Sequence, residues 1–219
     1  MTISALVFDF DGVLVDSEPL HLRAYQVVLS SLGIQMTREE YFARYLGFDD
    51  EGVFRAFAAD HGWTLNGAQI ETLIAEKSRV MGRMLASTDV LYPGAAACVE
   101  RVAGAFPLGI ASGALRHEIE AVLDRARLRR HFRFIVAAGD TRLSKPSPDP
   151  YRLAATLHNV SPEFCAAIED SQWGIESARA AGLMCIGLAT TYPRDVLAGA
   201  HIVIDSLDEL TVELIKSLA

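Results

Sequence analysis

Six short apolar runs, separated by stretches with helical spacing, constrain the fold of this chain more than any other feature. They lie at residues 5–9, 107–111, 133–137, 164–168, 183–188 and 201–204. Apolar runs of this length, without polar alternation, are typical of strands that are buried on both faces of a sheet. Helical patterns separate them, at residues 94–105, 116–127, 149–158 and 172–181. We therefore predict an α/β fold with a doubly wound parallel sheet.

Residues 18–85 break this alternation, because they contain helical patterns and no strand pattern. Four helices are expected there, at about residues 18–32, 38–46, 51–61 and 68–86. The sequence therefore predicts an all-helical insert at residues 17–86. The core of the fold would then comprise residues 1–16 and 87–219.

The composition excludes several classes of protein. The chain of 219 residues is 51% hydrophobic and has a net charge of −8, so it can bury a sizeable core but offers no basic surface for nucleic acid. Its three cysteines lack the spacing of a zinc site or a disulfide framework. We see neither a signal peptide nor an uncharged stretch long enough to span a membrane. We expect a cytoplasmic monomer that binds neither nucleic acid nor membrane.

Four of the apolar runs lead into polar residues that can carry chemistry. These residues are Asp9 with Asp11, Ser112, Lys145, and Glu169 with Asp170. In a parallel sheet, ligands bind beyond the carboxyl ends of the strands, so we expect these side chains to share one site. Crowded carboxylates repel one another unless they bind a cation or a proton. Oxygen ligands without Cys or His suit Mg²⁺, which is the cofactor we predict.

The two aspartates after the first strand have the chemistry of a nucleophile and an acid. Asp9 is ionised at neutral pH without help from a base, so its carboxylate can attack phosphorus and form an aspartyl-phosphate. Asp11 lies two residues further on, where it can protonate the leaving oxygen and later accept a proton from water. The pair predicts phosphoryl transfer with Asp9 and Asp11 as catalytic residues.

The other polar residues can hold the transferred phosphate. Gly12 allows the backbone to turn and to approach the phosphate closely. Ser112 and the amide of Gly113 can donate hydrogen bonds to phosphoryl oxygens. Lys145 can neutralise charge on the phosphoryl group and on Asp9. We therefore predict a phosphate-binding site formed by these four residues, with Lys145 also catalytic.

The order and spacing of these residues resemble the haloacid dehalogenase-like (HAD) hydrolase superfamily. Residues 9–18, Asp-Phe-Asp-Gly-Val-Leu-Val-Asp-Ser-Glu, resemble its first signature. Ser112-Gly113 resembles the second motif, Lys145-Pro146 the third, and Glu169-Asp170-Ser171 the fourth. The helical insert is similar to the cap of the subgroup that contains β-phosphoglucomutase and phosphoglycolate phosphatases.

The resemblance implies a Rossmann-like core with an inserted helical cap that closes over the site and selects the substrate. It implies that Mg²⁺ is held by the Asp9 side chain, the Asp11 backbone carbonyl and Asp170, with Glu169 binding directly or through water. The activity implied is that of a phosphoric monoester hydrolase acting on a small phosphorylated metabolite, such as a sugar phosphate or phosphoglycolate. Candidate substrate contacts are Ser17, Glu18, His21, Lys77 and Arg116.

A sugar phosphomutase resembling β-phosphoglucomutase is the main alternative. His21 and Lys77 match positions that matter in that enzyme. However, its cap arginine, which grips the phosphate that is not transferred, is replaced here by an acidic stretch at residues 47–51. Such a stretch would repel a second phosphate, so we favour simple hydrolysis. A catalytically silent regulatory protein is a further alternative, but such proteins typically lose Asp9 or Asp11.

Overall fold

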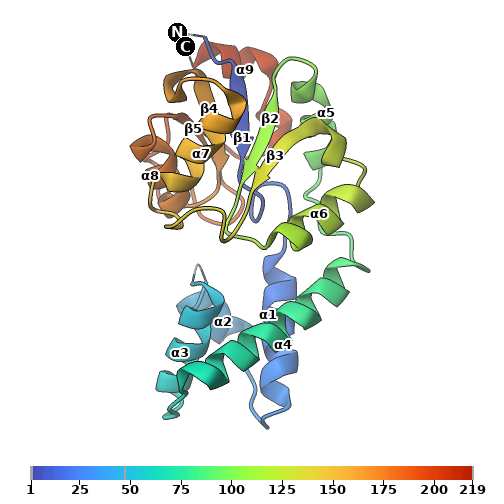
Figure 1. Cartoon of the computed structure of the whole chain (residues 1–219), viewed down its shortest axis with the longest axis vertical. Coiled ribbons are helices and arrows are strands. Elements are labelled where there is room, and N and C mark those ends of the chain that lie inside the picture. The colour runs from blue at the N-terminus through green and yellow to red at the C-terminus, as the bar shows by residue number, and fades with distance from the viewer. Residues whose placement is uncertain (1, 47, 219) are drawn as a thin grey trace. The chain divides into compact units, whose positions relative to one another are not determined.

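A parallel β-sheet organises the larger of the two units into which this computed structural model divides (Figure 1). That unit combines residues 1–16 with 89–219, and the smaller unit comprises residues 17–88. The structure describes residues 2–46 and 48–218. Within them the sheet has six strands in the order β3-β2-β1-β4-β5-β6. The strands are β1 (Ala5–Phe8), β2 (Leu108–Ala111), β3 (Phe132–Val136), β4 (Cys165–Glu169), β5 (Met184–Leu188) and β6 (Ile202–Ile204).

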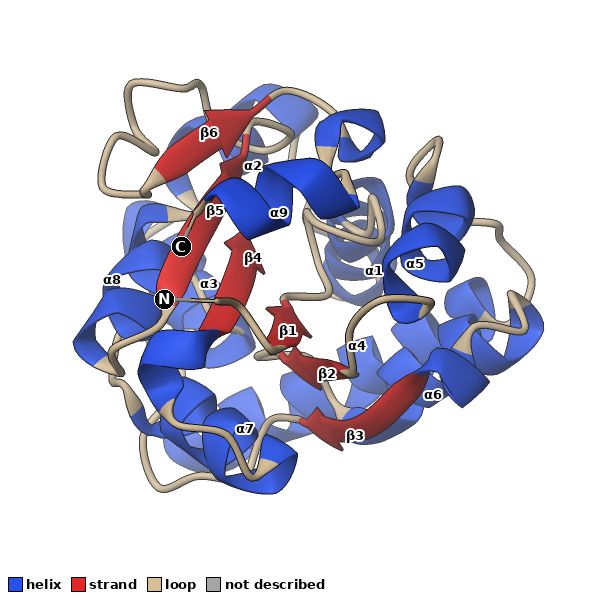
Figure 2. Cartoon of the chain, turned by 90° about the horizontal axis from the view of Figure 1, so that it is seen from above, coloured by secondary structure: helices blue, strands red, loops and turns tan. Residues whose placement is uncertain are grey.

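Helices cover both faces of the sheet, as a doubly wound fold requires. They are α5 (Ala95–Ala103), α6 (Arg116–Arg125), α7 (Asp149–His158), α8 (Gln172–Ala180) and α9 (Val212–Ser217). Figure 2 shows α7 and α8 on one side of the sheet, and α5 and α9 on the other. The predicted fold class is therefore confirmed. The short helix α9 was not among the sequence predictions.

The strand order reverses next to β1, and this reversal places the site. The chain passes from β1 outward to β2 and β3, and then returns to lay β4 against the other edge of β1. Phe8 pairs with Ile168, and the amide of Asp9 donates to the Ile168 carbonyl at 2.9 Å. The carboxyl ends of β1 and β4 therefore lie side by side, at the switch point where open α/β sheets bind ligands.

A continuous apolar core lies under α7 and α8. The β1 and β4 side chains are fully buried, as expected of central parallel strands. Tyr151 and Ala154 of α7, and Ile175 and Ala178 of α8, pack into the same cluster. Ser171 caps α8 by accepting a hydrogen bond from the Gly174 amide at 3.1 Å. This packing fixes the start of α8 beside the end of β4.

The smaller unit consists of helices, as the sequence predicts for the insert. They are α1 (Glu18–Ser30), α2 (Arg38–Arg44), α3 (Asp50–Asp60) and α4 (Gly67–Leu85), coloured blue to green in Figure 1. Both α1 and α3 pack against α4. Side chains of Thr37, Asp49 and Asn66 cap α2, α3 and α4. Gly47, which begins the acidic stretch, lies outside the described residues.

No helix within the described ranges is long and apolar enough to span a membrane.

Candidate active site

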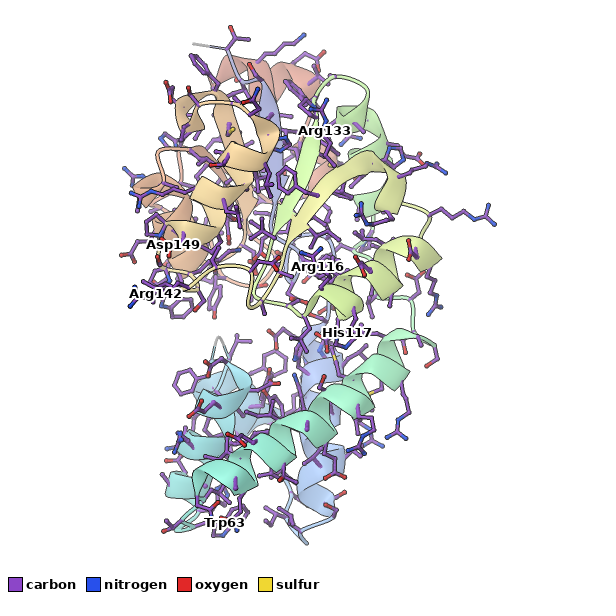
Figure 3. All side chains as sticks on the ribbon, in the orientation of Figure 1. Trp63, Arg116, His117, Arg133, Arg142 and Asp149 are labelled. Carbon is purple, nitrogen blue, oxygen red and sulfur yellow. The ribbon has the colours of Figure 1, made fainter. Side chains whose placement is uncertain are left out.

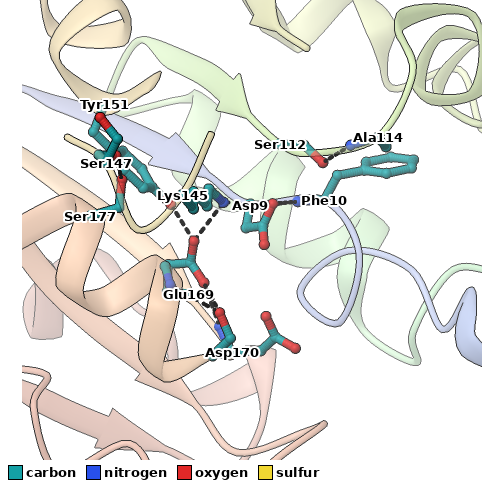
Figure 4. A network of polar contacts seen from close by, with 12 residues as sticks. Asp9, Phe10, Ser112, Ala114, Lys145, Ser147, Tyr151, Glu169, Asp170 and Ser177 are labelled. Carbon is teal, nitrogen blue, oxygen red and sulfur yellow. Dashed lines mark hydrogen bonds and ion pairs between the residues drawn. The ribbon is translucent and has the colours of Figure 1, made fainter. Parts of the chain in front are cut away.

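Asp9 lies directly after β1 and is largely buried. Its Oδ1 atom accepts a hydrogen bond from the Phe10 amide at 2.7 Å and forms an ion pair with Lys145 Nζ at 3.0 Å (Figure 4). Two donors on one oxygen fix the plane of the carboxylate, and neither of them uses Oδ2. A carboxylate oriented in this way is suited to nucleophilic attack.

Lys145 joins the end of β1 to the end of β4. It lies in the loop between β3 and α7, and its Nζ contacts Glu169 Oε1 at 2.6 Å as well as Asp9. Glu169 is the last residue of β4 and is fully buried. Burial alone would lower the pKa of Lys145, but the charges of Asp9 and Glu169 outweigh this effect and raise it. The lysine therefore stays protonated and can stabilise negative charge on a phosphoryl group.

Three carboxylates form a buried cluster at this edge of the sheet. Asp9, Glu169 and Asp170 each offer an oxygen, and these atoms lie within 4.8 Å of one another. Burial raises the pKa of Asp9 to about 7, and repulsion from Glu169 and Asp11 adds to the rise. The attraction of Lys145 offsets only part of this effect. Burial and the charges of Asp9 and Glu169 also raise the pKa of Asp170.

This cluster fits a hard divalent cation. Its donors are carboxylate oxygens without a thiolate or imidazole, and two of them carry pKa values that a nearby positive charge would lower. The buried acidic group can therefore hold a metal ion. Thr191 adds a side-chain hydrogen bond to Asp170, which orients one of the candidate ligands.

The turn after β1 requires glycine at position 12. Gly12 has φ +74°, and a Cβ atom there would lie 1.9 Å from Asp170 Oδ2. The Asp170 carboxylate thus lies against the Gly12 backbone, while the Thr190 hydroxyl donates to the Gly12 carbonyl. Asp11 sits within this turn and is close enough to raise the pKa of Asp9. The loop therefore places Asp11 near the Asp9 carboxylate and the Gly12 backbone against Asp170.

Ser112 and Gly113 follow β2, the strand adjacent to β1. The Ser112 amide donates to the Val136 carbonyl at 2.9 Å, and its Oγ accepts from the Ala114 amide at 3.0 Å. Figure 4 shows Ser112 on the side of Asp9 away from Glu169. Gly113 is exposed and has open space around its α-carbon. Their role in phosphate binding stays a prediction.

Arg116 has a structural environment that the sequence did not indicate. It is the first residue of α6 (Figure 3), and its guanidinium pairs with Asp140 at 2.6 Å and donates to the Ile135 carbonyl at 2.8 Å. Asp140 also accepts from the Ala137 amide at 2.8 Å. Arg116 thus ties α6 to the turn after β3, and its proposed contact with substrate stays a prediction.

The candidate substrate contacts of the helical unit form two groups. Ser17 is buried at the start of α1, and Glu18 accepts a hydrogen bond from the Tyr41 hydroxyl at 2.7 Å. Lys77 is buried, and its Nζ lies 2.8 Å from His21 Nδ1 and 2.8 Å from Asp50 Oδ1. The structure therefore brings His21 and Lys77 together and pairs the lysine with an acidic residue that the sequence had linked only to phosphate repulsion.

Two kinds of residue at the site were missed from sequence. Thr190 and Thr191 lie two and three residues after β5, so the rule used for the other strand ends would have found them. Tyr151 donates from its hydroxyl to Glu169 Oε1 at 2.7 Å. No sequence signal marks Tyr151, because it lies on a helix and meets Glu169 only through the packing of α7 on the sheet.

The comparison with protein families agrees with this fold. The model for haloacid dehalogenase-like hydrolases matches residues 3–182. The chain therefore belongs to the haloacid dehalogenase-like hydrolase family, as the four motifs indicated.

Individual relatives cover almost the whole chain. Hexitol phosphatase B of Escherichia coli (strain K12) is 34% identical, over 96% of this chain and 96% of the relative. Beta-phosphoglucomutase of Bacillus subtilis (strain 168) is 28% identical, over 97% of this chain and 94% of the relative. The crystal structure of CbbY from Rhodobacter sphaeroides in complex with phosphate has a TM-score of 0.86 at 30% identity, covering 98% of this chain and 99% of that one.

Proposed function

We propose that this protein is a Mg²⁺-dependent phosphatase that hydrolyses a small sugar phosphate or a similar phosphorylated metabolite through an aspartyl-phosphate. The observation that carries the proposal is the position of Lys145, whose Nζ bridges Asp9 Oδ1 at 3.0 Å and Glu169 Oε1 at 2.6 Å. The bridge places a fixed positive charge beside a strand-end carboxylate within an acidic cluster. The resemblance to a hexitol phosphatase supports the substrate class.

In the first half-reaction, Asp9 attacks phosphorus and the bond from phosphorus to the leaving oxygen breaks. Asp11 gives its proton to that oxygen, so the alcohol leaves in neutral form. In the second, Asp11 accepts a proton from water as the water attacks the aspartyl-phosphate, which releases phosphate and restores Asp9. Lys145, Ser112 and the Gly113 amide hold the phosphoryl oxygens throughout.

A bound Mg²⁺ would offset the charge that develops on the phosphoryl oxygens. Asp9, Asp170 and the Asp11 carbonyl would hold it, with Glu169 adjacent. The raised pKa values of Asp9 and Asp170 support this assignment, because a cation relieves the repulsion that raises them.

The charges of the helical unit support hydrolysis over the mutase alternative. Lys77 is paired with Asp50 at 2.8 Å, and Arg55 is paired with Glu51 at 2.7 Å. Cations that are already neutralised hold a second phosphate poorly, since each phosphate must compete with a carboxylate. A monophosphate, which needs no second anion site, is therefore the substrate that we propose.

The test is hydrolysis of p-nitrophenyl phosphate with and without Mg²⁺, followed by a panel of hexitol phosphates, hexose phosphates and phosphoglycolate. We expect Mg²⁺-dependent release of phosphate that the Asp9→Asn variant abolishes while its circular dichroism spectrum is retained. Folded wild-type protein that binds Mg²⁺ without turning over any substrate would instead indicate a silent regulatory protein. Conversion of β-glucose 1-phosphate to glucose 6-phosphate after priming with a bisphosphate would identify a mutase.

A further inference from the structure

Tyr151 places a hydroxyl group within the core that lies under α7 and α8. It lies in the first turn of α7 and is completely buried, among the largest side chains of the core under α7 and α8. A buried tyrosine hydroxyl requires a hydrogen-bond partner. The partner here is Glu169 Oε1 at 2.7 Å, the same oxygen that Lys145 contacts (Figure 4).

The Glu169 carboxylate is saturated by donors from the protein. Oε1 accepts from Lys145 at 2.6 Å and from Tyr151 at 2.7 Å, and Oε2 accepts from the Asp170 amide and the Ser171 hydroxyl, both at 3.2 Å. A carboxylate offers about four lone-pair sites. The Glu169 carboxyl group also lies against Gly174, where an added Cβ atom would be 1.9 Å from Glu169 Cδ. Glu169 is thus a fixed anchor.

Lys145 depends on this anchor for its position. Lys145 lies in a loop, and a hydrogen bond from the Ser177 hydroxyl to the carbonyl of Ser147, two residues further on, holds this loop against α8. The tip of the Lys145 side chain is shared between Asp9 and Glu169, which leaves one N–H of the ammonium for a phosphoryl oxygen. The Tyr151 ring also faces Nζ, at 5.1 Å from the ring centroid.

The Tyr151 hydroxyl therefore influences how Lys145 is shared between its two carboxylates. By donating to Oε1, the hydroxyl takes up part of the negative charge that would otherwise draw the ammonium to Glu169. We propose that Tyr151 is a positioning residue for phosphoryl transfer, which acts through Glu169 to keep Lys145 on Asp9 and on the phosphoryl group. This inference rests on the proposed phosphatase function.

The variant Tyr151→Phe tests the proposal, because it keeps the ring and its contact with Lys145 and removes only the hydroxyl donor. We expect kcat to fall about tenfold, while KM and the Kd for Mg²⁺ change less than about twofold. We expect kcat to change more than KM and the Kd for Mg²⁺ because the hydroxyl donates to Glu169 Oε1, the oxygen that also holds Lys145. An unchanged kcat would overturn the proposal, and so would a weakening of Mg²⁺ binding that matches the loss of kcat.

Tyr45→Phe is the matched control. The Tyr45 side chain is also fully buried, and its hydroxyl donates to a carboxylate, Asp60 Oδ2, at the same distance of 2.7 Å. A general loss of stability should therefore appear in both variants, whereas we expect kcat to fall only in Tyr151→Phe. Equal effects on kcat would show that the hydroxyl of Tyr151 acts on stability alone and would contradict the proposal.

A double-mutant cycle with Glu169→Gln isolates the route through Glu169. We expect Tyr151→Phe to lower kcat little further when the Glu169 charge has been removed, since the two changes affect one anchor. If the effects of the two changes on kcat were fully additive, Tyr151 would not act through Glu169, and the proposal would be refuted. Wild-type and Asp9→Asn proteins are assayed first. Absence of wild-type turnover would contradict the proposed function and this inference with it. Normal wild-type turnover together with an unchanged kcat in Tyr151→Phe would contradict this inference alone.

Discussion

Replacing Gly174 by alanine should destabilise the larger unit, although alanine is the better helix former. Gly174 lies in the first turn of α8, where the exchange would ordinarily stabilise a helix by up to about 1 kcal/mol. Here the new Cβ would lie 1.9 Å from Glu169 Cδ and Oε1 and 2.0 Å from Oε2. The carboxylate must move, and with it the hydrogen bonds that hold it.

The magnitude follows from two costs and one gain. Overpacking of a rigid interior costs about 1–3 kcal/mol, and disturbing a hydrogen bond to a charged group costs about 1.5–3 kcal/mol. After the gain in helix propensity, the net loss is about 2–5 kcal/mol. With an m-value of about 2 kcal/mol/M, the urea midpoint should fall by about 1–2.5 M.

The two tryptophans allow each unit to be followed by fluorescence. Trp173 lies in α8 of the larger unit, and Trp63 packs on Phe57 in the helical unit. Gly174→Ala is measured in a Trp63→Phe background, so that Trp173 alone reports unfolding.

The matched control is Gly82→Ala, measured in a Trp173→Phe background. Gly82 is inside α4, and a Cβ atom added there would meet no atom of another described segment within 4 Å, so this exchange should stabilise the helical unit by about 1 kcal/mol. If Gly174→Ala were as stabilising as Gly82→Ala, the tight placement of Glu169 against α8 would be wrong.

Three further predictions concern catalysis, metal binding and pH. Asp11→Asn should slow hydrolysis of an ester with a poor leaving group by about 10²–10⁴-fold in steady-state assays, and an unchanged rate would exclude Asp11 as the acid. Thr191→Val should weaken Mg²⁺ binding in calorimetric titrations by about tenfold, because it removes the hydrogen bond that orients Asp170; unchanged affinity would contradict this. His158 is buried, donates from Nε2 to the Leu6 carbonyl at 3.1 Å and leaves Nδ1 without a partner among the described residues. Burial, with a smaller effect from Arg133, lowers its pKa below the usual 6.5, so its contribution to stability is present above that pH and is lost as the pH falls further. Urea titrations across this range should show a flatter pH dependence for His158→Gln, and parallel curves for the two proteins would contradict the assignment.

The strands and motifs could be predicted because they depend on local sequence. A run such as Ala5–Phe8 is apolar at every position since both faces of its strand are covered, and the polar residues at its end follow from the sheet topology. The helices of the insert were predictable from their periodicity for the same reason. The short helix α9 carries too few turns for its pattern to stand out.

The contacts that refine the site could not be predicted, because they join distant segments. The hydrogen bond of Tyr151 with Glu169 spans α7 and β4, and the pairing of Lys77 with Asp50 spans two helices of the insert. Such pairs depend on how helices are rotated and packed, which single-sequence patterns do not specify. Gly174 illustrates the limit: its sequence position suggests an ordinary helical glycine, and only the structure shows the carboxylate against it.

The central claim is that Asp9 carries the phosphoryl group during turnover, and trapping that group tests the claim most directly. The protein is mixed with a rapidly hydrolysed phosphate ester and Mg²⁺, quenched in acid within milliseconds, digested, and analysed by mass spectrometry. We predict a phosphoryl adduct on the peptide that contains Asp9, and its loss in Asp9→Asn. An adduct on a different side chain would contradict the account, as would undiminished turnover by the folded Asp9→Asn protein.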